Sequence, residues 1–372
     1  MKPAILFVTL FSCLPLRAQS PEAPGAPSAE QQARLVQAEN EARLAVQQHP
    51  GDATAYASLG VALSRAGEYP EAISAYKKAF SMNPHLPGIQ LNWGIAEFKQ
   101  GHFQAAIAPL TAALTLDPAS AQARTLLGLS CYGAKQFAEA ANLLAVVVQS
   151  QPSNIELRKV LAQSCLLAKN YSCAETEFRQ IVEQNPDSAS VHILMGEALD
   201  GLSRTPEAIA EFEAAAKANP QEPDVNFGLG YLQWKSNHFE DAKTSFHHQL
   251  AVDPNHAQAL AYLGDIAMKE DHFDQALPYL EKSIQQRKDL RIAHVDLGAV
   301  LMQQKCYPEA LAALQQAVTL DPTQPDAHFR LGRLYQATGK LTDAEREFAK
   351  VRELHEKADD VASQMSKPAT TQ

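Results

Sequence analysis

Two cysteines bracket seven residues in the stretch CLLAKNYSC, which runs from Cys165 to Cys173. Cysteine thiolates bind metals, exchange disulfides and form structural cross-links, so several chemistries suit side chains of this type. The spacing alone does not distinguish a metal clip, a redox pair and a structural disulfide from two unrelated cysteines. The elements that carry the two side chains must decide among them.

Other catalytic or metal-binding patterns are absent from the sequence. It contains no GxSxG, P-loop, GxGxxG or HExxH motif. The adjacent pair His247 and His248 falls in a helical pattern, where neighbouring side chains point in different directions, so a shared metal ion is not expected. We therefore predict a non-enzyme without catalytic residues, metal ligands or cofactors. The alternative, an enzyme of unrecognised type, would be revived by any turnover of the isolated chain.

The composition favours a helical, acidic protein. The 372 residues are 46% hydrophobic but only 7% aromatic, and the net charge is -10. A nucleic-acid-binding protein normally presents a basic face, so we expect no nucleic-acid partner.

The first residues differ from the rest of the chain. A short apolar run follows Lys2, and residues 1–18 resemble a secretory signal peptide with cleavage after Ala18. The alternatives are an uncleaved anchor and a lipoprotein signal in which Cys13 is lipidated. The mature chain is therefore expected to be exported, periplasmic or secreted, without a membrane span. Residues 19–29, rich in Pro and Ala, are predicted to form a linker.

Small residues recur through the sequence with a period of 34. The series is Gly60, Gly94, Gly128, Ala162, Gly196, Gly230, Gly264, Gly298 and Gly332, and an alanine follows each member after twelve residues. In seven of the nine cases a proline follows twelve residues later. Each period holds two helical patterns, A and B. The small residues let the two helices approach closely, and the proline prevents helix B from continuing.

Because of these features, the segment from Tyr56 to Pro84, YASLGVALSRAGEYPEAISAYKKAFSMNP, resembles the tetratricopeptide repeat, and so does His328 to Phe348. The resemblance implies an all-α fold, a right-handed superhelical solenoid of helical hairpins with the A helices along its concave surface. Lys288 and Glu356 stand where a proline is expected, so the last helix should run on past Glu356.

The repeats define the expected domain organisation. Residues 30–52 are predicted to be a capping helix, and residues 359–372 the end of a C-terminal capping helix and a disordered tail. Nine units should fill residues 53–358: 53–86, 87–120, 121–154, 155–188, 189–222, 223–256, 257–290, 291–324 and 325–358.

The family register implies that positions 2, 5, 9, 12 and 13 of each unit face the concave groove. The partner-binding residues predicted on this basis are Leu91, Ile95, Phe98, Leu129, Tyr132, Ile193, Phe227, Tyr231, Trp234, Lys235, Met268, Lys269, Met302, Phe329 and Arg333. Phe227, Tyr231 and Trp234 form the sharpest candidate, with i, i+4, i+7 spacing. Asn226 and Gln233 occupy core positions of the same helix, so a rotated helix that buries the aromatics is the alternative.

The groove should bind a protein or peptide segment of unknown identity. The carboxylate clamp of chaperone-binding members is not matched, because Lys159 is followed by Gln163 and then Glu197 where asparagines would stand. The leading hypothesis is a non-catalytic scaffold in the cell envelope or outside the cell. The second is an accessory subunit of an envelope enzyme, secretion or polymer-export complex.

The repeat register also changes the interpretation of the cysteines. Cys131 and Cys165 fall at position 11 of successive A helices, too far apart for an easy disulfide. Both are predicted to be buried packing residues, and Cys173 an exposed thiol at position 19. A disulfide between Cys165 and Cys173 across one hairpin remains the alternative in an oxidising compartment.

Overall fold

A computed structural model describes residues 28–365 of the chain, with side chains up to residue 360. The predicted signal segment 1–18, Cys13, all but the end of the linker at residues 19–29, and the final residues of the expected tail lie outside the described residues.

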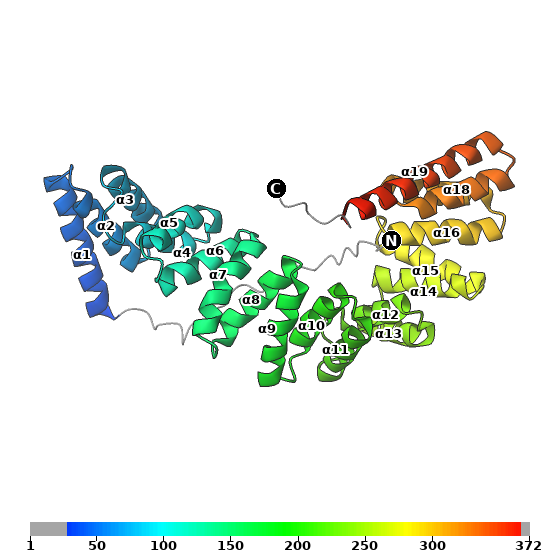
Figure 1. Cartoon of the computed structure of the whole chain (residues 1–372), viewed down its shortest axis with the longest axis horizontal. Helices are drawn as coiled ribbons and strands as arrows, with labels where there is room; N and C mark the ends of the chain where they lie inside the picture. Colours follow the sequence, from blue (N-terminus) through cyan, green and yellow to red (C-terminus); the bar gives the residue numbers. More distant parts are fainter. Residues whose placement is uncertain (1–27, 366–372) are drawn as a thin grey trace. The chain divides into compact units, whose positions relative to one another are not determined.

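The described residues form α-helices connected by short turns, without a β-strand (Figure 1). The helix α1 (Ala29–Gln48) precedes nine helical pairs. The A helices are α2 (Ala53–Ala66), α4 (Ile89–Lys99), α6 (Ala121–Gly133), α8 (Ile155–Leu167), α10 (Ala189–Gly201), α12 (Val225–Lys235), α14 (Ala257–Lys269), α16 (Arg291–Gln303) and α18 (Pro325–Ala337). The B helices are α3 (Tyr69–Met82), α5 (Phe103–Leu116), α7 (Phe137–Ser150), α9 (Tyr171–Gln184), α11 (Thr205–Ala218), α13 (Phe239–Val252), α15 (Phe273–Gln286), α17 (Tyr307–Leu320) and α19 (Leu341–Met365). The predicted all-α repeat fold is confirmed.

Local signals in the sequence set the helix ends. Ser28 and Gln31 form a reciprocal capping box at the start of α1. The side chain of Asp52 accepts a hydrogen bond from the Thr54 amide at the start of α2, and Gly67 ends that helix in a left-handed conformation. The last helix has no proline at Glu356 and continues to Met365, as the missing proline predicts.

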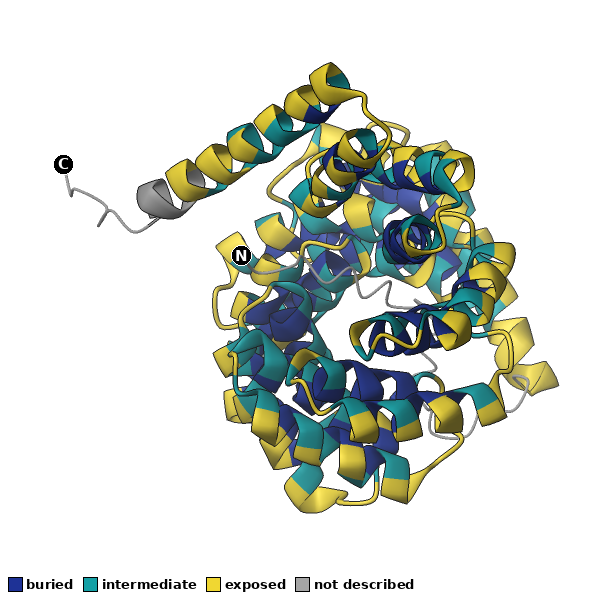
Figure 2. Ribbon diagram, turned by 90° about the vertical axis from the view of Figure 1, so that its right-hand side faces the viewer, coloured by how far each residue is buried: buried dark blue, intermediate teal, exposed yellow. Residues whose placement is uncertain are grey.

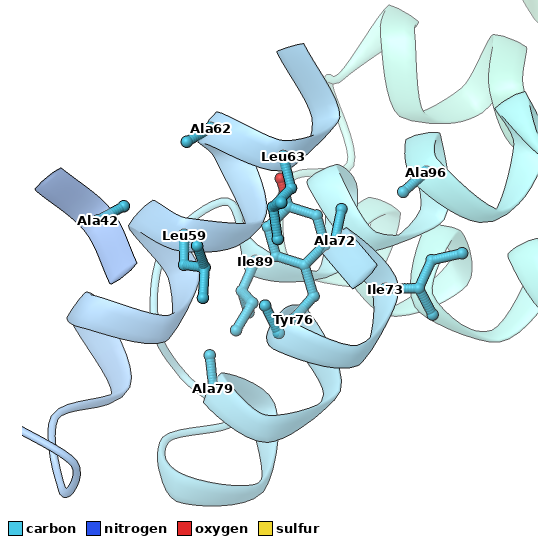
Figure 3. Packing of buried hydrophobic residues seen from close by; sticks show 11 residues of the cluster. Ala42, Leu59, Ala62, Leu63, Ala72, Ile73, Tyr76, Ala79, Ile89 and Ala96 are labelled. Atoms are coloured by element: carbon cyan, nitrogen blue, oxygen red, sulfur yellow. The ribbon is translucent and has the colours of Figure 1, made fainter. Parts of the chain in front are cut away.

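Close packing within each pair explains the recurring glycine. A Cβ atom added to Gly60 would lie 2.6 Å from the Tyr76 ring, and one added to Gly128 would lie 2.7 Å from Leu144. The repeat alanine beside them, such as Ala72, is fully buried. Figure 3 shows the result in the first repeat, where Leu63, Ala72 and Tyr76 pack together between the helices. The small residue therefore makes room for the large residue sixteen positions later.

Contacts divide the chain into two compact units. The N-terminal unit comprises residues 28–186 with residues 197–203, and the C-terminal unit comprises residues 187–196 with the chain from residue 204 onward. Within the N-terminal unit, α2, α4, α6 and α8 contact one another in succession. Within the C-terminal unit, α12, α14, α16 and α18 do the same. Each unit therefore presents a row of neighbouring A helices.

The last helix, α19, packs on α18, and its first part contributes Glu347 and Phe348 to that contact. Its second part carries mostly exposed and half-buried residues (Figure 2). A polar outer helix of this kind covers the end of a repeat array.

Candidate binding surface on the A helices

The predicted groove residues differ widely in exposure. Phe227 and Tyr231 are buried. The exposed members are Lys235, Lys269, Phe329 and Arg333. The remaining members are half-buried: Leu91, Ile95, Phe98, Leu129, Tyr132, Ile193, Trp234, Met268 and Met302. The half-buried members combine packing contacts with an accessible face.

Phe227 and Tyr231 belong to the core, as the alternative for this helix predicts, although Asn226 and Gln233 stay buried as well. Almost every residue of α12 is buried, including the polar Asn226 and Gln233. Asn226 donates a hydrogen bond to the carbonyl oxygen of Pro220 over 3.2 Å, and Gln233 accepts one from Ser245 over 2.7 Å. These bonds satisfy the polar side chains inside the core. The helix therefore buries its polar and aromatic sides together, and the expectation of an exposed aromatic stripe is corrected to Trp234.

Trp234 lies at the edge of an aromatic cluster formed by α12, α13 and α14. Its ring centroid is 4.8 Å from that of Tyr262, and Tyr231 is 5.6 Å from Tyr262. Tyr262 also stacks on Phe246, with centroids 5.6 Å apart. These edge and stacked arrangements are the favourable geometries of aromatic pairs.

Charged groups adjoin the Trp234 ring. The indole Nε1 of Trp234 donates a 2.5 Å hydrogen bond to Oδ2 of Asp265. Lys269 forms an ion pair with the same oxygen, and its Nζ atom lies 4.5 Å from the centroid of the Trp234 ring. This position is a cation–π contact.

A second carboxylate, that of Asp296, lies on the next A helix. It is buried, and the closest guanidinium nitrogen of Arg330 is 3.9 Å from its Oδ1 atom. Burial and the neighbouring charge of Asp265 raise the pKa of Asp296, and Arg330 opposes that shift.

Tyr262, Asp296 and Arg330 also belong to this surface, although the repeat register did not predict them there. All three occupy position 6 of successive units, a position that the family register does not assign to the groove. The signal available in the sequence was the pair of charged side chains, Asp296 and Arg330, at a position outside the predicted groove set.

The N-terminal unit has a simpler surface. Phe98 contacts Phe103 with ring centroids 5.6 Å apart, and Tyr132 contacts Phe137 at 5.8 Å. The Tyr132 hydroxyl donates a 3.0 Å hydrogen bond to Gln163 on the next A helix. Leu91 packs against the same core as Phe98 and Tyr132. These side chains are supported by the core while part of their surface stays accessible.

In both compact units, several half-buried groove residues occupy the same position of the repeat, position 12. Position 12 carries Phe98 and Tyr132 in the N-terminal unit, and Trp234, Met268 and Met302 in the C-terminal unit. Because α4 contacts α6, and α14 contacts both α12 and α16, these side chains form a row of two in the N-terminal unit and a row of three in the C-terminal unit.

The cysteines differ from the preferred prediction. Cys165 and Cys173 form a disulfide, with their Cα atoms 5.7 Å apart. Position 11 of helix A faces position 19 of helix B within a hairpin, so the two side chains meet although they are eight positions apart in the sequence. Cys131 is a buried free thiol, as expected, and burial raises its pKa to about 11. Cys173 is therefore not a free thiol in this structure.

Two other kinds of site are absent from the described part of the chain. No group of three or more His, Cys, Asp or Glu side chains is arranged to hold a metal ion there. No helix in that part is both long enough and apolar enough to cross a membrane.

Paired helices of 34-residue period, joined in rows of contacting A helices, define an α-helical repeat protein. Models of the tetratricopeptide repeat match residues 53–86, 91–155, 132–198, 202–266 and 298–339. The chain belongs to the tetratricopeptide repeat family. Proteins of this family are generally non-catalytic scaffolds.

Solved structures with this fold are similar over different lengths. The Cut9–Hcn1 hetero-tetramer of the APC/C has a TM-score of 0.52 at 16% identity, over 84% of this chain and 63% of that one. Yeast Tom70 has a TM-score of 0.42 at 16% identity, over 87% and 89%. YrrB, described as a tetratricopeptide protein with an unusual peptide-binding site, has a TM-score of 0.39 at 21% identity, over 48% and 91%. No curated protein sequence matches the chain significantly.

Proposed function

We propose that this protein is a non-catalytic scaffold that holds an extended segment of a partner protein along its A helices, in the cell envelope or outside the cell. The observation that carries the proposal is the position-12 row. Trp234, Met268 and Met302 present large, half-buried apolar side chains on three contacting helices. Aromatic side chains and methionines are enriched at protein interfaces, and methionine adapts to varied partners.

The spacing of the row suits an extended segment. Neighbouring packed helices lie about 8–10 Å apart, and an extended chain advances about 3.3 Å per residue. About every third residue of the segment would then reach the next member of the row. Side-chain pockets repeated in this way give affinity to a bound peptide without requiring catalytic groups.

The disulfide supports the proposed location. Disulfides persist in secreted and periplasmic proteins and are rare in the reducing cytosol. The Cys165–Cys173 pair thus agrees with the export expected from residues 1–18.

Site-specific photo-cross-linking in the native host tests the proposal. One variant carries the photoreactive residue at Lys235, exposed beside Trp234, and the control carries it at Gln285, exposed on the B helix α15. We expect a defined partner protein to be cross-linked at position 235 and not at 285. The same products at both positions, or none at 235, would contradict a binding surface on the A helices.

A further inference from the structure

Two buried carboxylates lie on contacting A helices of the C-terminal unit, close enough for the charge of Asp265 to raise the pKa of Asp296. Asp265 on α14 is 5% exposed and Asp296 on α16 is 3% exposed. Burying a charged group is unfavourable unless it is paired and hydrogen-bonded. Asp265 meets this condition through Trp234 and Lys269.

Asp296 does not meet it. Its Oδ2 atom is buried, and no donor among the described residues lies within hydrogen-bond distance. Arg330 approaches only the other oxygen, at 3.9 Å, which is too long for a hydrogen bond. A buried acceptor without a donor is costly, so a ligand that supplies N–H groups and positive charge would be favoured here.

The surroundings already accommodate one cation. The Nζ atom of Lys269 lies on the Trp234 ring and on Asp265, so an ammonium group occupies the aromatic side of the cluster. Its side chain is 38% exposed, and that of Arg330 is 34% exposed. Long, exposed side chains of this type change rotamer readily. They can move aside for an incoming group without a rearrangement of the helices.

From this geometry we infer that Asp296, Asp265 and Trp234 form a receptor for one arginine side chain of the bound segment. The planar guanidinium supplies paired donors for carboxylates and stacks on aromatic rings, which an ammonium group does less well. It would donate to Oδ2 of Asp296 and lie against the Trp234 ring, while Lys269 moves toward solvent. The net charge of -10 favours approach of a basic segment. The inference rests on the proposed function and adds the chemistry of the partner.

The arginine receptor overlaps the position-12 row of Trp234, Met268 and Met302. Trp234 belongs to both, so one bound segment can place an arginine at the carboxylates and an apolar residue three positions away at Met268 or Met302.

The test uses the full chain carrying Trp93→Phe, which leaves Trp234 as the remaining tryptophan of two. The probe is the capped heptapeptide Leu-Ser-Ser-Arg-Ser-Ser-Leu. Its control replaces the arginine with citrulline, which keeps the shape and removes the charge. We expect the arginine peptide to change the Trp234 emission saturably and to bind about tenfold more tightly than the citrulline peptide.

Two variants examine the assigned residues. Asp296→Asn should reduce the preference for arginine over citrulline to less than about twofold, because the charge-assisted bond is lost. Lys269→Met should keep the preference, since it removes a competing cation. Equal binding of the two peptides to the parent chain, or an unchanged preference in Asp296→Asn, would overturn the inference.

The possible failures are distinguishable. If both peptides bind equally and Lys235 still cross-links to a partner, the scaffold function stands and the arginine receptor is wrong. If neither peptide binds and no partner is cross-linked, both are wrong.

Discussion

Glu197 is a single residue in which burial on an A helix disfavours the charged form of a side chain. It is a half-buried carboxylate on α10, and burial raises its pKa to about 7 from an ordinary value of 4.5. The folded state therefore keeps the proton that the unfolded state releases at a lower pH. The stability contribution of the protonated form is complete below about pH 4.5 and is lost as the pH rises through 7.

Replacement of this carboxylate should raise stability in alkaline solution. Glu197→Gln has no proton to lose, so its free energy of unfolding at pH 9 should exceed that of the wild type by about 1–3 kcal/mol. At pH 4.5 the difference should be small. Urea denaturation followed by circular dichroism at pH 4.5, 7 and 9 measures the free energy of unfolding of the variant and of the wild type.

Glu183→Gln is the matched control, because Glu183 is exposed on α9, the B helix that precedes α10 in the chain. It should shift the urea midpoint little at any of these pH values. A Glu197→Gln advantage that does not grow between pH 4.5 and 9 would contradict burial as the cause of the raised pKa.

The residues at position 6 mark what the sequence alone could not reveal. The repeat pattern correctly predicts that Asp296 and Tyr262 lie on A helices. Their roles, however, depend on contacts with side chains from other repeats. Trp234 meets Asp265 only because α12 and α14 are neighbours, thirty-one residues apart in the chain. Periodicity predicts the neighbouring helices, but the partners of each side chain depend on rotamers that a repeat pattern does not encode.

At the scale of the elements, a polar residue at position 4 of helix A ties the helix to the preceding turn. Gln90, Arg124, Arg158, Asn226, His294 and His328 each lie within hydrogen-bond distance, 2.5 to 3.2 Å, of the carbonyl oxygen six residues earlier. That carbonyl belongs to the proline, or to Lys288, which separates one hairpin from the next. Position 4 therefore links consecutive repeats.

His328 is a suitable residue for testing this link. Its Nε2 atom is 3.2 Å from the carbonyl oxygen of Pro322, and its Nδ1 atom is 2.7 Å from Glu347 on α19. His328→Leu removes both interactions and leaves a carbonyl and a half-buried carboxylate without this partner. We expect a loss of about 1–3 kcal/mol in the free energy of unfolding. Urea denaturation measures the loss, and hydrogen exchange should locate it in α18 and α19.

The chain supplies its own steric control for that variant. Leu260 occupies position 4 of α14 and is buried, and there Lys282 donates instead to the Pro254 carbonyl oxygen over 2.8 Å. Leucine therefore fits the position. The double variant His328→Leu with Glu347→Gln should recover part of the lost stability, because it no longer leaves a carboxylate unpaired. An unchanged urea midpoint in the single variant would show that the link contributes little.

The helical pairs themselves were accessible from sequence, for reasons that Gly60 and Pro84 illustrate. A small residue facing a large one recurs in every repeat, as glycine in eight of nine, and a proline follows helix B in seven of nine, so the same local constraints return along the chain. The burial of α12 on all its sides was not accessible in the same way. Asn226 and Gln233 are polar at core positions, and only their hydrogen bonds to Pro220 and Ser245 make burial of the whole helix acceptable.

Across the whole molecule, the disulfide links the fold to the proposed export, because an oxidising compartment is needed to maintain it. Cys165 and Cys173 join the two helices of one hairpin, α8 and α9. The repeat register placed them correctly on opposite helices, but distances along the sequence did not reveal that positions 11 and 19 face each other. An exported chain would keep this cross-link, and a chain retained in the cytosol would be reduced.

Expression in a bacterial host with and without residues 1–18 tests this dependence. The version that carries residues 1–18 should be cleaved after Ala18, so the protein recovered from the envelope fraction should begin near Gln19. Trypsin cleaves after Lys169, between the two cysteines, so its non-reducing digest should contain peptides 160–169 and 170–179 joined together. The version without residues 1–18 should give the two peptides separately after alkylation in the cell.

The cross-link should also affect stability, since it closes a short loop between helices that already pack together. Reduction, or Cys173→Ser, is expected to lower the free energy of unfolding by about 2 kcal/mol. Cys306→Ser is the control, because Cys306 is a free thiol.

Two outcomes of the expression experiment would contradict the link between export and the disulfide. If the chain is recovered from the envelope but peptides 160–169 and 170–179 are found separately in the non-reducing digest, export does not oxidise the pair. A chain that stays in the cytosol in both versions would refute the export signal, and the disulfide would then lack the compartment that maintains it.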